Sequence, residues 1–540
     1  MMADGGIIIV NNVKLPTNAS IQEAFSVARR RLSTVGVHAK NRDCTVYRRS
    51  VDARCRGDIK FVYSIAVRAD VVPGDDKLQG VEASRLVCGE VKPIIGTTRL
   101  SAPPVVVGTG PCGLFAALLL AEWGYSPVIL ERGGSVAARR EAIERLRRFR
   151  ILDPDTNIQF GAGGAGTFSD GKLVTRVNDP LVSYVLDRFI EFGAPEEIRY
   201  IAKPHIGTDI LAEIVDKMLA YIEKKGGRVL YNTKFISAVT ESGAVRSVKT
   251  SRGDMPAGAL ILAIGHSARN TYAELISKGY NIQAKDFSVG MRIEHKTVDI
   301  DRAMYGDMAG DPALGHAEYN LSHNTKVRGV YTFCMCPGGE VVAAASEEGG
   351  VVVNGMSENA RAGENSNSAV VATVFRDDYG STPEKAIEFQ RRIERAAFSA
   401  GGSDYSAPII TVGDFLDKKL TSEPKRIIPT YMNGEGVRLA SPESYLPSFV
   451  TEAIRGALPA FDRRIEGFAA RDAVLTGAET RTSSPVRILR DPKTHLADGF
   501  TNIYPAGEGA GYAGGITSAS IDGIKTALCL MREFSPQKIV

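Results

Sequence analysis

The chain has 540 residues, 44% of them hydrophobic and 24% charged, with a formal net charge of +4. This composition excludes disordered and fibrous proteins, implies no anionic partner for the whole molecule, and leaves room for two or more domains. No apolar stretch reaches the ~20 residues of a bilayer span, residues 1–10 have no basic region before a signal-like core, and seven cysteines, an odd number, favour reduced thiols, so we expect a soluble cytoplasmic protein.

Residues 1–88 predict a small N-terminal α+β domain. Ser20 and Glu23 form a capping-box pattern before a helical stretch. The other hydrophobic patterns in this part are typical of strands. The expected elements are strands over residues 7–15, 44–49 and 59–68 and a helix that ends near Leu32.

The first 100 residues carry 16 Lys and Arg against 10 Asp and Glu. These basic groups either bind RNA or another anion, or form a solvated face, which we favour because no aromatic-glycine RNA signature accompanies them. The groups are Arg29, Arg30, Arg31, Arg48, Arg49, Arg54 and Arg56. Residues 89–103, with Pro93, Gly96 and Pro103, are the predicted linker.

Residues 104–131 have the pattern of a strand, a tight turn, a helix and a second strand. A G-x-G-x-x-G motif follows the first apolar run, at Gly108, Gly110 and Gly113. These glycines allow the turn, the approach of backbone N–H groups to a pyrophosphate, and close packing of the helix on the strand. We expect a diphosphate at the helix N-terminus, where Pro111 and Cys112 lie.

The second apolar run ends in Glu131, whose carboxylate can accept a hydrogen bond from an adenosine ribose hydroxyl. The same carboxylate would repel a 2′-phosphate, which leaves FAD and NAD as the candidate dinucleotides. A glycine-rich packing turn without a ligand is the alternative. Arg132 and Arg139 are also expected near the cofactor, although most arginines of the helix over residues 137–150 should form a solvated face.

Residues 160–172 form a glycine-rich stretch between two phenylalanines, FGAGGAGTFSDGK. So much glycine is typical of backbone that passes close to a flat or bulky group, and we interpret the stretch as a loop against an isoalloxazine ring. A flexible surface loop is the alternative, but Phe160 and Phe168 would be unusual there. The residues expected at the cofactor are Gly163, Gly164, Ser169, Gly171 and Lys172.

Helices are expected over residues 181–192 and 208–224, and strands over 227–231 and 247–251. Residues 259–265, ALILAIG, predict another buried strand. In FAD folds with two βαβ units such a strand returns beside the first, and its terminal Gly265 passes near the cofactor. His266 then lies close to the ligand or serves as a capping residue, and the sequence leaves both open.

Residues 293–471 have shorter apolar runs and many glycines, which predict an inserted α+β substrate domain. Within it, Cys334 and Cys336 form a C-x-C pair. A structural role is favoured over a redox pair because buried cysteine is a common small hydrophobe. Metal binding is disfavoured because no second C-x₂-C or His cluster completes four ligands. His316 and His323 are possible substrate contacts.

The C-terminal part, residues 502–523, contains a short strand that ends at Gly507 and Glu508, and a glycine-rich turn that opens a helix over 516–532. Glu508 can accept a hydrogen bond from a ribityl chain. The helix N-terminus can stabilise negative charge on the N1–C2=O edge of a reduced flavin, which selects FAD over NAD. The residues at that end are Gly514, Gly515, Ile516 and Thr517.

Together the segments GTGPCG, GAGGAGTFSDGKL, ETRTSSPVRI and YPAGEGAGYAGGITSASIDG resemble the family of uncharacterised bacterial FAD-dependent dehydrogenases. The segment SVDARCRGDIKFVYSIAV resembles the N-terminal extension of that family, so the similarity covers nearly the whole chain. The resemblance implies bound FAD and oxidoreductase activity, but no substrate. We add the hypothesis that Arg481 or Arg487 binds an acidic substrate.

The predicted fold class is α/β, with a doubly wound, Rossmann-like FAD-binding domain formed by residues 104–292 and 472–540. The inserted domain, residues 293–471, would hold a small-molecule substrate. The expected reaction is hydride transfer through flavin N5, and NAD(P)H would bind only transiently because there is one G-x-G-x-x-G motif. A flavoprotein that binds or acts on RNA through its basic N-terminal domain is the alternative.

Overall fold

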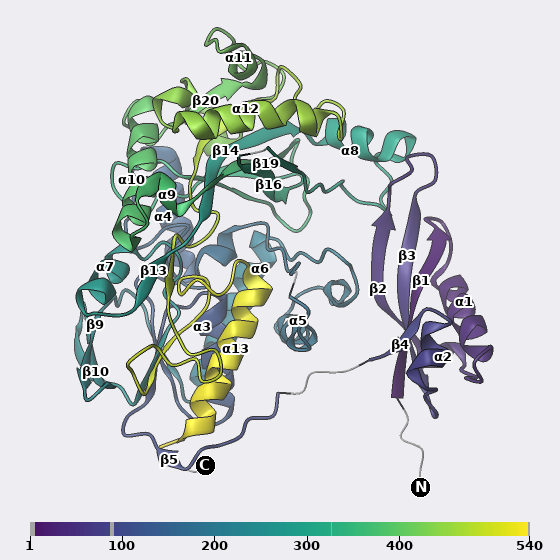
Figure 1. The fold of residues 1–540 in the computed structure, drawn as a ribbon, viewed down its shortest axis with the longest axis horizontal. Coiled ribbons are helices and arrows are strands. Elements are labelled where there is room, and N and C mark those ends of the chain that lie inside the picture. The colour runs from purple at the N-terminus through teal and green to yellow at the C-terminus, as the bar shows by residue number, and fades with distance from the viewer. Residues whose placement is uncertain (1–5, 87–90, 176, 326, 538–540) are drawn as a thin grey trace. The chain divides into compact units, whose positions relative to one another are not determined.

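A computed structural model describes residues 6–86, 91–175, 177–325 and 327–537 (Figure 1). The chain separates into two compact units. Unit 1 comprises Met1–Val91, Arg176–His205 and Asp301–Ala317, and unit 2 comprises Lys92–Thr175, Ile206–Ile300 and Glu318–Val540. Across the described ranges, every helix is too short or too polar to cross a membrane.

Unit 1 contains a four-stranded antiparallel sheet in the order β2-β3-β1-β4. Its strands are β1 (Gly6–Pro16), β2 (Cys44–Asp52), β3 (Lys60–Ala69) and β4 (Ala83–Arg85). Helix α1 (Ile21–Ser33) packs on β1 and β3 and begins with the predicted capping box of Ser20 and Glu23. The unit also has α2 (Asp75–Gln79) and α5 (Leu181–Glu191). The predicted strands and the predicted helix of this part are confirmed.

The centre of unit 2 is a five-stranded parallel sheet in the order β24-β12-β6-β7-β8. Its strands are β6 (Pro104–Val107), β7 (Val128–Leu130), β8 (Arg228–Leu230), β12 (Ala259–Leu262) and β24 (Ile503–Pro505). Val105 pairs with Val128 on one side and Leu260 on the other. The strand over 259–262 therefore returns beside the first strand, as predicted, and the strand order reverses between β6 and β12 as in a doubly wound sheet.

Both faces of this sheet are covered. On one side lie α3 (Pro111–Glu122), α6 (Thr208–Lys224) and α13 (Ile516–Glu533), and α4 (Val136–Phe149) packs on α6. Packed against Val105, Leu260 and Leu262 are an antiparallel sheet of β9 (Phe235–Glu241), β10 (Ala244–Thr250) and β11 (Gly253–Pro256), and α7 (Arg269–Ser277). Burial on both faces explains why the strands of the parallel sheet read as continuous apolar runs.

Helices α3 and α13 lie side by side (Figure 1). Their backbones approach so closely that a Cβ at Gly523 would lie 2.1 Å from the carbonyl oxygen of Cys112. A Cβ at Gly113 would lie 2.0 Å from the carbonyl oxygen of Gly108, as the packing role of that glycine requires. The two helices thus bring two segments about 400 residues apart in sequence together at their N-terminal ends.

A second large sheet in unit 2 has seven strands in the order β15-β16-β19-β14-β22-β20-β21. These are β14 (Phe287–Lys296), β15 (Ser322–Asn324), β16 (Gly329–Cys336), β19 (Asn365–Val374), β20 (Ala407–Thr411), β21 (Val437–Leu439) and β22 (Val474–Glu479). Helix α12 (Ser448–Asp462) covers β14, β16 and β19 (Figure 1). Helix α10 (Pro383–Ala400) packs on β20 and β22.

Two features of this sheet differ from the sequence prediction. Strands β14 and β19 have ten residues each, longer than the short strands expected, because buried polar residues such as Arg292, Glu294 and Asn367 hide their apolar pattern. The sheet also includes residues on both sides of the predicted 293–471 segment, since it begins at Phe287 and includes Glu479.

The remaining strands of unit 2 are short. They are β5 (Thr98–Arg99), β13 (Ile282–Ala284), β17 (Glu340–Ala343), β18 (Val353–Met356), β23 (Val486–Ile488) and β25 (Phe534–Ser535). Strand β5 lies in the predicted linker of residues 89–103 and pairs in parallel with β25, so this segment contains a short strand that the sequence did not predict. Two residues are too few to give a strand pattern in the sequence. Residues 89 and 90 of that linker lie outside the described residues.

Candidate functional site

The turn between β6 and α3 has the geometry of a phosphate cradle. The first N–H to bond a carbonyl within α3 is that of Leu114, which donates to Gly110 (2.9 Å). The N–H groups of Cys112 and Gly113 therefore have no partner within the helix, and together with the macrodipole they favour an anion. Gly108 has φ +98°, a left-handed conformation that glycine adopts without strain.

Gly110 differs from Gly108 and Gly113 because the protein itself does not require a glycine there. Its φ is −59°, which any residue adopts, and a Cβ would meet only Gly164 Cα, at 4.0 Å. The same holds for Gly514 and Gly515 at the start of α13, where a Cβ would meet no heavy atom of the described residues within 4 Å. Glycines that neither the backbone nor the packing explains stand at the N-termini of both helices.

The Glu131 carboxylate is buried and accepts hydrogen bonds from the protein. One oxygen accepts from the N–H (3.1 Å) and the hydroxyl of Thr109, and the other from the N–H groups of Gly133 (3.0 Å) and Gly161 (2.9 Å). The carboxylate thus ties the cradle turn to the start of the glycine-rich loop. Its bond to a ribose stays a prediction.

Arg139 is predicted near the cofactor phosphates. In the structure its guanidinium binds the backbone of the loop over residues 157–162. It donates to the carbonyl oxygens of Asn157 (3.1 Å), Ile158 (2.8 Å) and Ala162 (2.5 Å), and lies 4.6 Å from the ring centroid of Phe168. The side chain is fully buried, and burial lowers its pKa to about 9. Arg139 therefore shapes the loop over residues 157–162.

The glycine-rich loop lies against the N-termini of both helices. A Cβ at Gly166 would contact Ile516 (3.3 Å) and Pro111 (3.4 Å), and the hydroxyl of Thr517 donates to the carbonyl of Leu173 (2.8 Å). Gly163, Gly164 and Gly171 have positive φ. The structure therefore brings together three predicted segments: the cradle, the loop and the start of α13.

Ser169 and Lys172, the polar candidates of this loop, have protein partners. The Ser169 hydroxyl donates to the carbonyl of Gly166 (2.7 Å) and accepts from the N–H of Gly171 (3.1 Å). The Lys172 ammonium donates to the carbonyl of Met335, with Asp170 at 3.7 Å. Burial would lower the pKa of Lys172, but nearby acidic groups, Asp170 first, raise it.

Glu508 and His266 lie beside each other at the carboxyl ends of β24 and β12. His266 Nδ1 is 3.6 Å from Glu508 Oε1, and a Cβ at Gly509 would lie 2.6 Å from the carbonyl oxygen of Gly265. The His266 Nε2 atom is buried and has no hydrogen-bond partner among the described residues. An unpaired buried nitrogen is costly, so a ligand atom at this position would stabilise it.

Two residues that the sequence does not predict as site residues support the backbone around Gly507 and the cradle. Asp522 of α13 accepts from the N–H of Gly507 (2.7 Å) and forms an ion pair with Arg490 (2.6 Å). Thr109 bridges the cradle and the loop because its hydroxyl accepts from the N–H of Gly163 (3.1 Å). Neither carries a motif of its own, although Asp522 lies inside the recognised C-terminal segment.

A cavity of about 380 Å³ opens beyond the carboxyl ends of β7, β8 and β12. Its wall includes residues that follow these strands, namely Arg132, Lys234, Ser267 and Arg269, and residues of α10, namely Arg391 and Glu394. The Arg132 guanidinium lies 4.1 Å from the ring centroid of Phe160, which also lines the cavity. In doubly wound sheets, ligands bind in the crevice at this end of the strands, where the strand order reverses.

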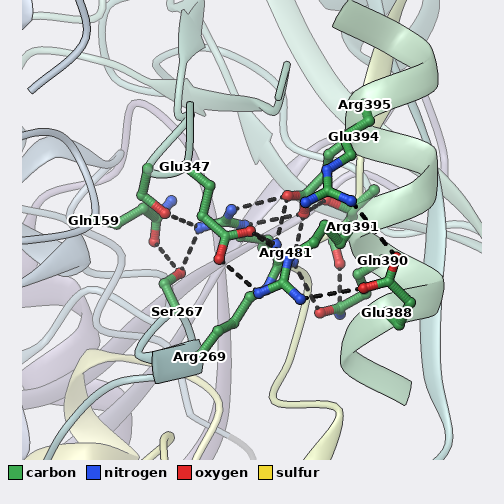
Figure 2. Close-up of polar contacts among 12 residues, drawn as sticks. Gln159, Ser267, Arg269, Glu347, Glu388, Gln390, Arg391, Glu394, Arg395 and Arg481 are labelled. Atoms are coloured by element: carbon green, nitrogen blue, oxygen red, sulfur yellow. Dashed lines mark hydrogen bonds and ion pairs between the residues drawn. The ribbon is translucent and has the colours of Figure 1, made fainter. Parts of the chain in front are cut away.

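A buried cluster of charges borders the cavity (Figure 2). Glu394 of α10 forms two bonds with Arg269 (2.7 Å each) and two with Arg481 (3.2 and 3.0 Å), and all three side chains are at most 3% exposed. Glu347 pairs with Arg269 (2.7 Å) and with Arg391 (2.8 Å). Three arginines thus share two glutamates.

The charges of this cluster hold one another ionised. Burial would raise the pKa of Glu394, but Arg269 and Arg481 overcome this and hold the pKa far below its ordinary value. The pKa of Glu347 is lowered to about 2, because hydrogen bonds from Arg391 and the charge of Arg269 outweigh burial. Apart from Arg481, none of these residues is predicted as a site residue from the sequence.

Arg487 and His316, which the sequence also suggests as substrate contacts, are not among the residues that line the cavity. Arg487 is exposed, donates to the carbonyl of Gly511 (3.3 Å) and lies 5.2 Å from the Tyr512 ring centroid. His316 belongs to unit 1, where its Nδ1 is 2.7 Å from Asp301 Oδ2. Residues 316 and 323, which the sequence analysis paired as possible substrate contacts, fall in different units.

The residues present fit an FAD. The two helix N-termini offer N–H groups to anionic oxygens, glycines leave room for close approach, and a buried His266 nitrogen lacks a partner. The cavity beyond β7 and β8 lies where the adenosine end of a dinucleotide would follow from a diphosphate at α3.

Comparisons with known proteins agree with this fit. Residues 286–482 match a family model described as "FAD-dependent protein, C-terminal domain-like". An uncharacterised protein of Clostridium beijerinckii is 43% identical over 502 residues, which are 91% of this chain and 93% of that protein.

Solved structures share only a distant likeness. An L-amino acid deaminase from Proteus vulgaris is 13% identical, with a TM-score of 0.32 over 83% of this chain and 97% of that one. A glycine oxidase from Geobacillus kaustophilus is 12% identical, with a TM-score of 0.34 over 81% and 96%. These scores are too low to carry over a substrate.

Proposed function

Since the chain belongs to the family of uncharacterised bacterial FAD-dependent dehydrogenases and is an FAD-dependent oxidoreductase, we propose that unit 2 binds FAD in an extended form across α3 and α13. The pyrophosphate would meet the N–H groups of Cys112 and Gly113. The adenosine would extend toward the cavity near Arg132 and Lys234. The observation that carries this proposal is the glycine at position 110, which neither backbone nor packing requires.

The flavin end would lie at the start of α13. Gly514 and Gly515 leave space there, and the N–H groups of the first turn favour the negative charge that a reduced flavin develops at its N1–C2=O edge. Glu508 and His266, beside each other, would receive the ribityl hydroxyls. When bound, FAD supplies hydride transfer at N5, and these residues of the chain bind and orient it.

The proposed reaction is hydride exchange with a small molecule, with NAD(P)H as a transient reductant. Within unit 2, the FAD-binding part would be drawn from residues 104–292 and 472–540, and the substrate side from residues 293–471. The RNA alternative is not proposed, because within unit 1 Arg31 pairs with Glu82 (2.9 Å), Arg54 pairs with Asp52 (2.6 Å) and Arg49 lies over the Phe61 ring.

Reconstitution with FAD tests the proposal. The Gly110→Val variant should fold and lose FAD binding, because a branched side chain would occupy the approach to the diphosphate while meeting little of the protein. Gly57→Val, at an exposed position where a Cβ meets nothing within 4 Å, is the matched control and should bind like wild type. If Gly110→Val has the wild-type melting temperature and also the wild-type affinity for FAD, the cradle is assigned wrongly.

A further inference from the structure

The C-x-C pair lies at an irregularity of the seven-stranded sheet. Phe333 pairs with Ala369 and Cys336 with Asn367, so the register of β16 on β19 shifts between them. Cys334, inside this bulge, has φ +45°, a left-handed conformation that is uncommon for a residue with a side chain. Such strain is typical of functional positions and is not needed for a cysteine that only fills the core.

Two cations are fixed at the bulge. Arg292 of β14 donates to the carbonyl of Cys334 (2.5 Å), and Lys172 of the glycine-rich loop donates to the carbonyl of Met335. Arg292 is fully buried and also bonds Asn354 (2.9 Å). The two cysteines therefore lie in a positive field that comes from two different segments of the chain.

Acidic groups face the same cluster. Asp170 lies 3.7 Å from the Lys172 ammonium and Glu318 3.9 Å. Glu479 lies 3.3 Å from Arg292, and burial raises its pKa to about 7 in spite of that arginine. Glu479 consequently offsets the positive charge only partly at neutral pH.

The two thiols differ in their acidity and exposure. The neighbouring Cys336 thiol and the positive charges of Arg292 and Lys172 together hold the pKa of Cys334 below its ordinary value, although burial opposes them. A hydrogen bond with Cys334 and burial raise the pKa of Cys336 well above its ordinary value. Cys334 is partly exposed and Cys336 fully buried. An accessible thiolate beside a protonated, buried partner is the arrangement of an attacking and a resolving cysteine.

We propose that Cys334 and Cys336 form a thiol–disulfide exchange site for small-molecule disulfides, with Cys334 as the attacking and Cys336 as the resolving residue. The inference stands on the bulge and on the cations around it, and it does not require FAD. It goes beyond the proposed function and replaces the structural role that the sequence alone favours for this pair.

The exchange balances without a further oxidant. The Cys334 thiolate attacks one sulfur of a disulfide R–S–S–R, so that a mixed disulfide forms and one R–S⁻ leaves. Cys336 then gives up its proton and attacks the Cys334 sulfur, so that the Cys334–Cys336 disulfide forms and the second R–S⁻ leaves. The proton of Cys336 and one proton from solvent, which replaces the one that Cys334 released on ionising, end on the two released thiols, and the substrate disulfide is reduced by two electrons.

Intact-mass measurement of the wild-type chain tests the proposal without any substitution. The full-length protein, first reduced, is incubated with oxidised glutathione and then alkylated. We expect a product two hydrogen atoms lighter, with the disulfide mapped to Cys334 and Cys336 and two equivalents of reduced glutathione released. If both thiols remain alkylatable, or if they carry only stable glutathione adducts, the proposal is wrong.

The Cys336→Ser variant traps the first step. Glutathione should accumulate on Cys334, and exposed Cys55 serves as the reference thiol in the same molecule. At pH 6 an ordinary thiol is only about 0.3% ionised, so a thiol whose pKa is lowered should react about tenfold faster even after correction for its lower nucleophilicity.

The pH profile separates this role from a structural one. The Cys334 rate should level off at a lower pH than that of an ordinary thiol, which gains about tenfold per unit up to about pH 8.5. Lys172→Gln should shift the Cys334 profile toward higher pH. A Cys334 profile that rises like that of Cys55, in a variant with the wild-type melting temperature, would overturn the assignment.

Discussion

Replacing Glu394 by glutamine tests the charge cluster of Figure 2 most directly. The substitution keeps the shape of the side chain and removes its charge. Glu394 accepts four bonds from Arg269 and Arg481 and one from the Thr480 hydroxyl (2.7 Å). An amide cannot accept on its nitrogen, so Glu394→Gln leaves two guanidinium groups buried with one carboxylate, that of Glu347, near them.

The size of the effect follows from burial. Removing one partner of a buried ion pair costs about 3–5 kcal/mol because the other charge remains desolvated. In a unit of roughly 400 residues this lowers the melting temperature by about 4–6 °C. The matched control is Glu388→Gln on the same helix, whose side chain is 46% exposed and pairs with Arg391 at 3.2 Å. An exposed pair contributes at most about 1 kcal/mol.

Thermal and urea unfolding of wild type, Glu394→Gln and Glu388→Gln at pH 7 measures the differences in stability. Glu394→Gln should be clearly less stable than wild type, and Glu388→Gln nearly unchanged. Equal midpoints for the two variants would refute the reasoning that the buried arginines depend on Glu394.

The difference in stability between wild type and Glu394→Gln should also depend on pH. The pKa of Glu394 in the folded protein lies below its unfolded value, so its contribution is complete above about pH 4.5 and is lost as the pH falls toward the folded pKa. The stability gap between wild type and Glu394→Gln should therefore narrow below about pH 4.5. A gap that stays constant down to pH 3 would contradict this linkage.

Two further substitutions test two different proposed contacts with the cofactor. Glu131→Gln should weaken FAD binding and also destabilise the protein without FAD by about 1–3 kcal/mol, because either the N–H groups of Gly133 and Gly161 or the N–H of Thr109 would face the amide nitrogen and lose their acceptor. An effect on FAD binding alone would mean that the carboxylate serves only the ribose. Glu508→Ala should change the flavin reduction potential more than Glu131→Gln does, and a spectroelectrochemical titration with equal shifts would contradict its proposed place near the ring.

The sequence predicted the cradle and its sheet well because the signals are local. Strand, turn, helix and strand lie within residues 104–131, and the apolar run that ends at Leu262 forms a strand beside β6 as expected. Because both faces of the sheet are buried, each of these strands has a continuous apolar pattern in the sequence. The start of α13 was also placed correctly, at Ile516, because the glycines before it end the preceding strand segment.

Partners of polar residues were harder to predict. Glu131 and Arg139 are predicted at a cofactor, which stays a prediction, but the sequence did not reveal their bonds to the backbone of Gly161 and Ala162 in the glycine-rich loop. A side chain that binds a loop and one that binds a ligand have the same residue type and the same position in sequence. Only the distance to the carbonyl oxygens or N–H groups distinguishes them, and no single sequence contains it.

Arg481 shows the same limit for long-range contacts. The sequence suggested that it binds an acidic substrate, but its guanidinium donates to Glu394, to the hydroxyl of Ser267 (3.0 Å) and to that of Ser346. These partners come from segments between 87 and 214 residues away, so no local pattern reveals them. A substrate carboxylate at Arg481 would have to displace Glu394, which would then remain buried with Arg269, an arginine that also pairs with Glu347. Because that exchange gains no bond and leaves the charge of Glu394 less well paired, we expect an acidic substrate to bind another cation of the cavity wall.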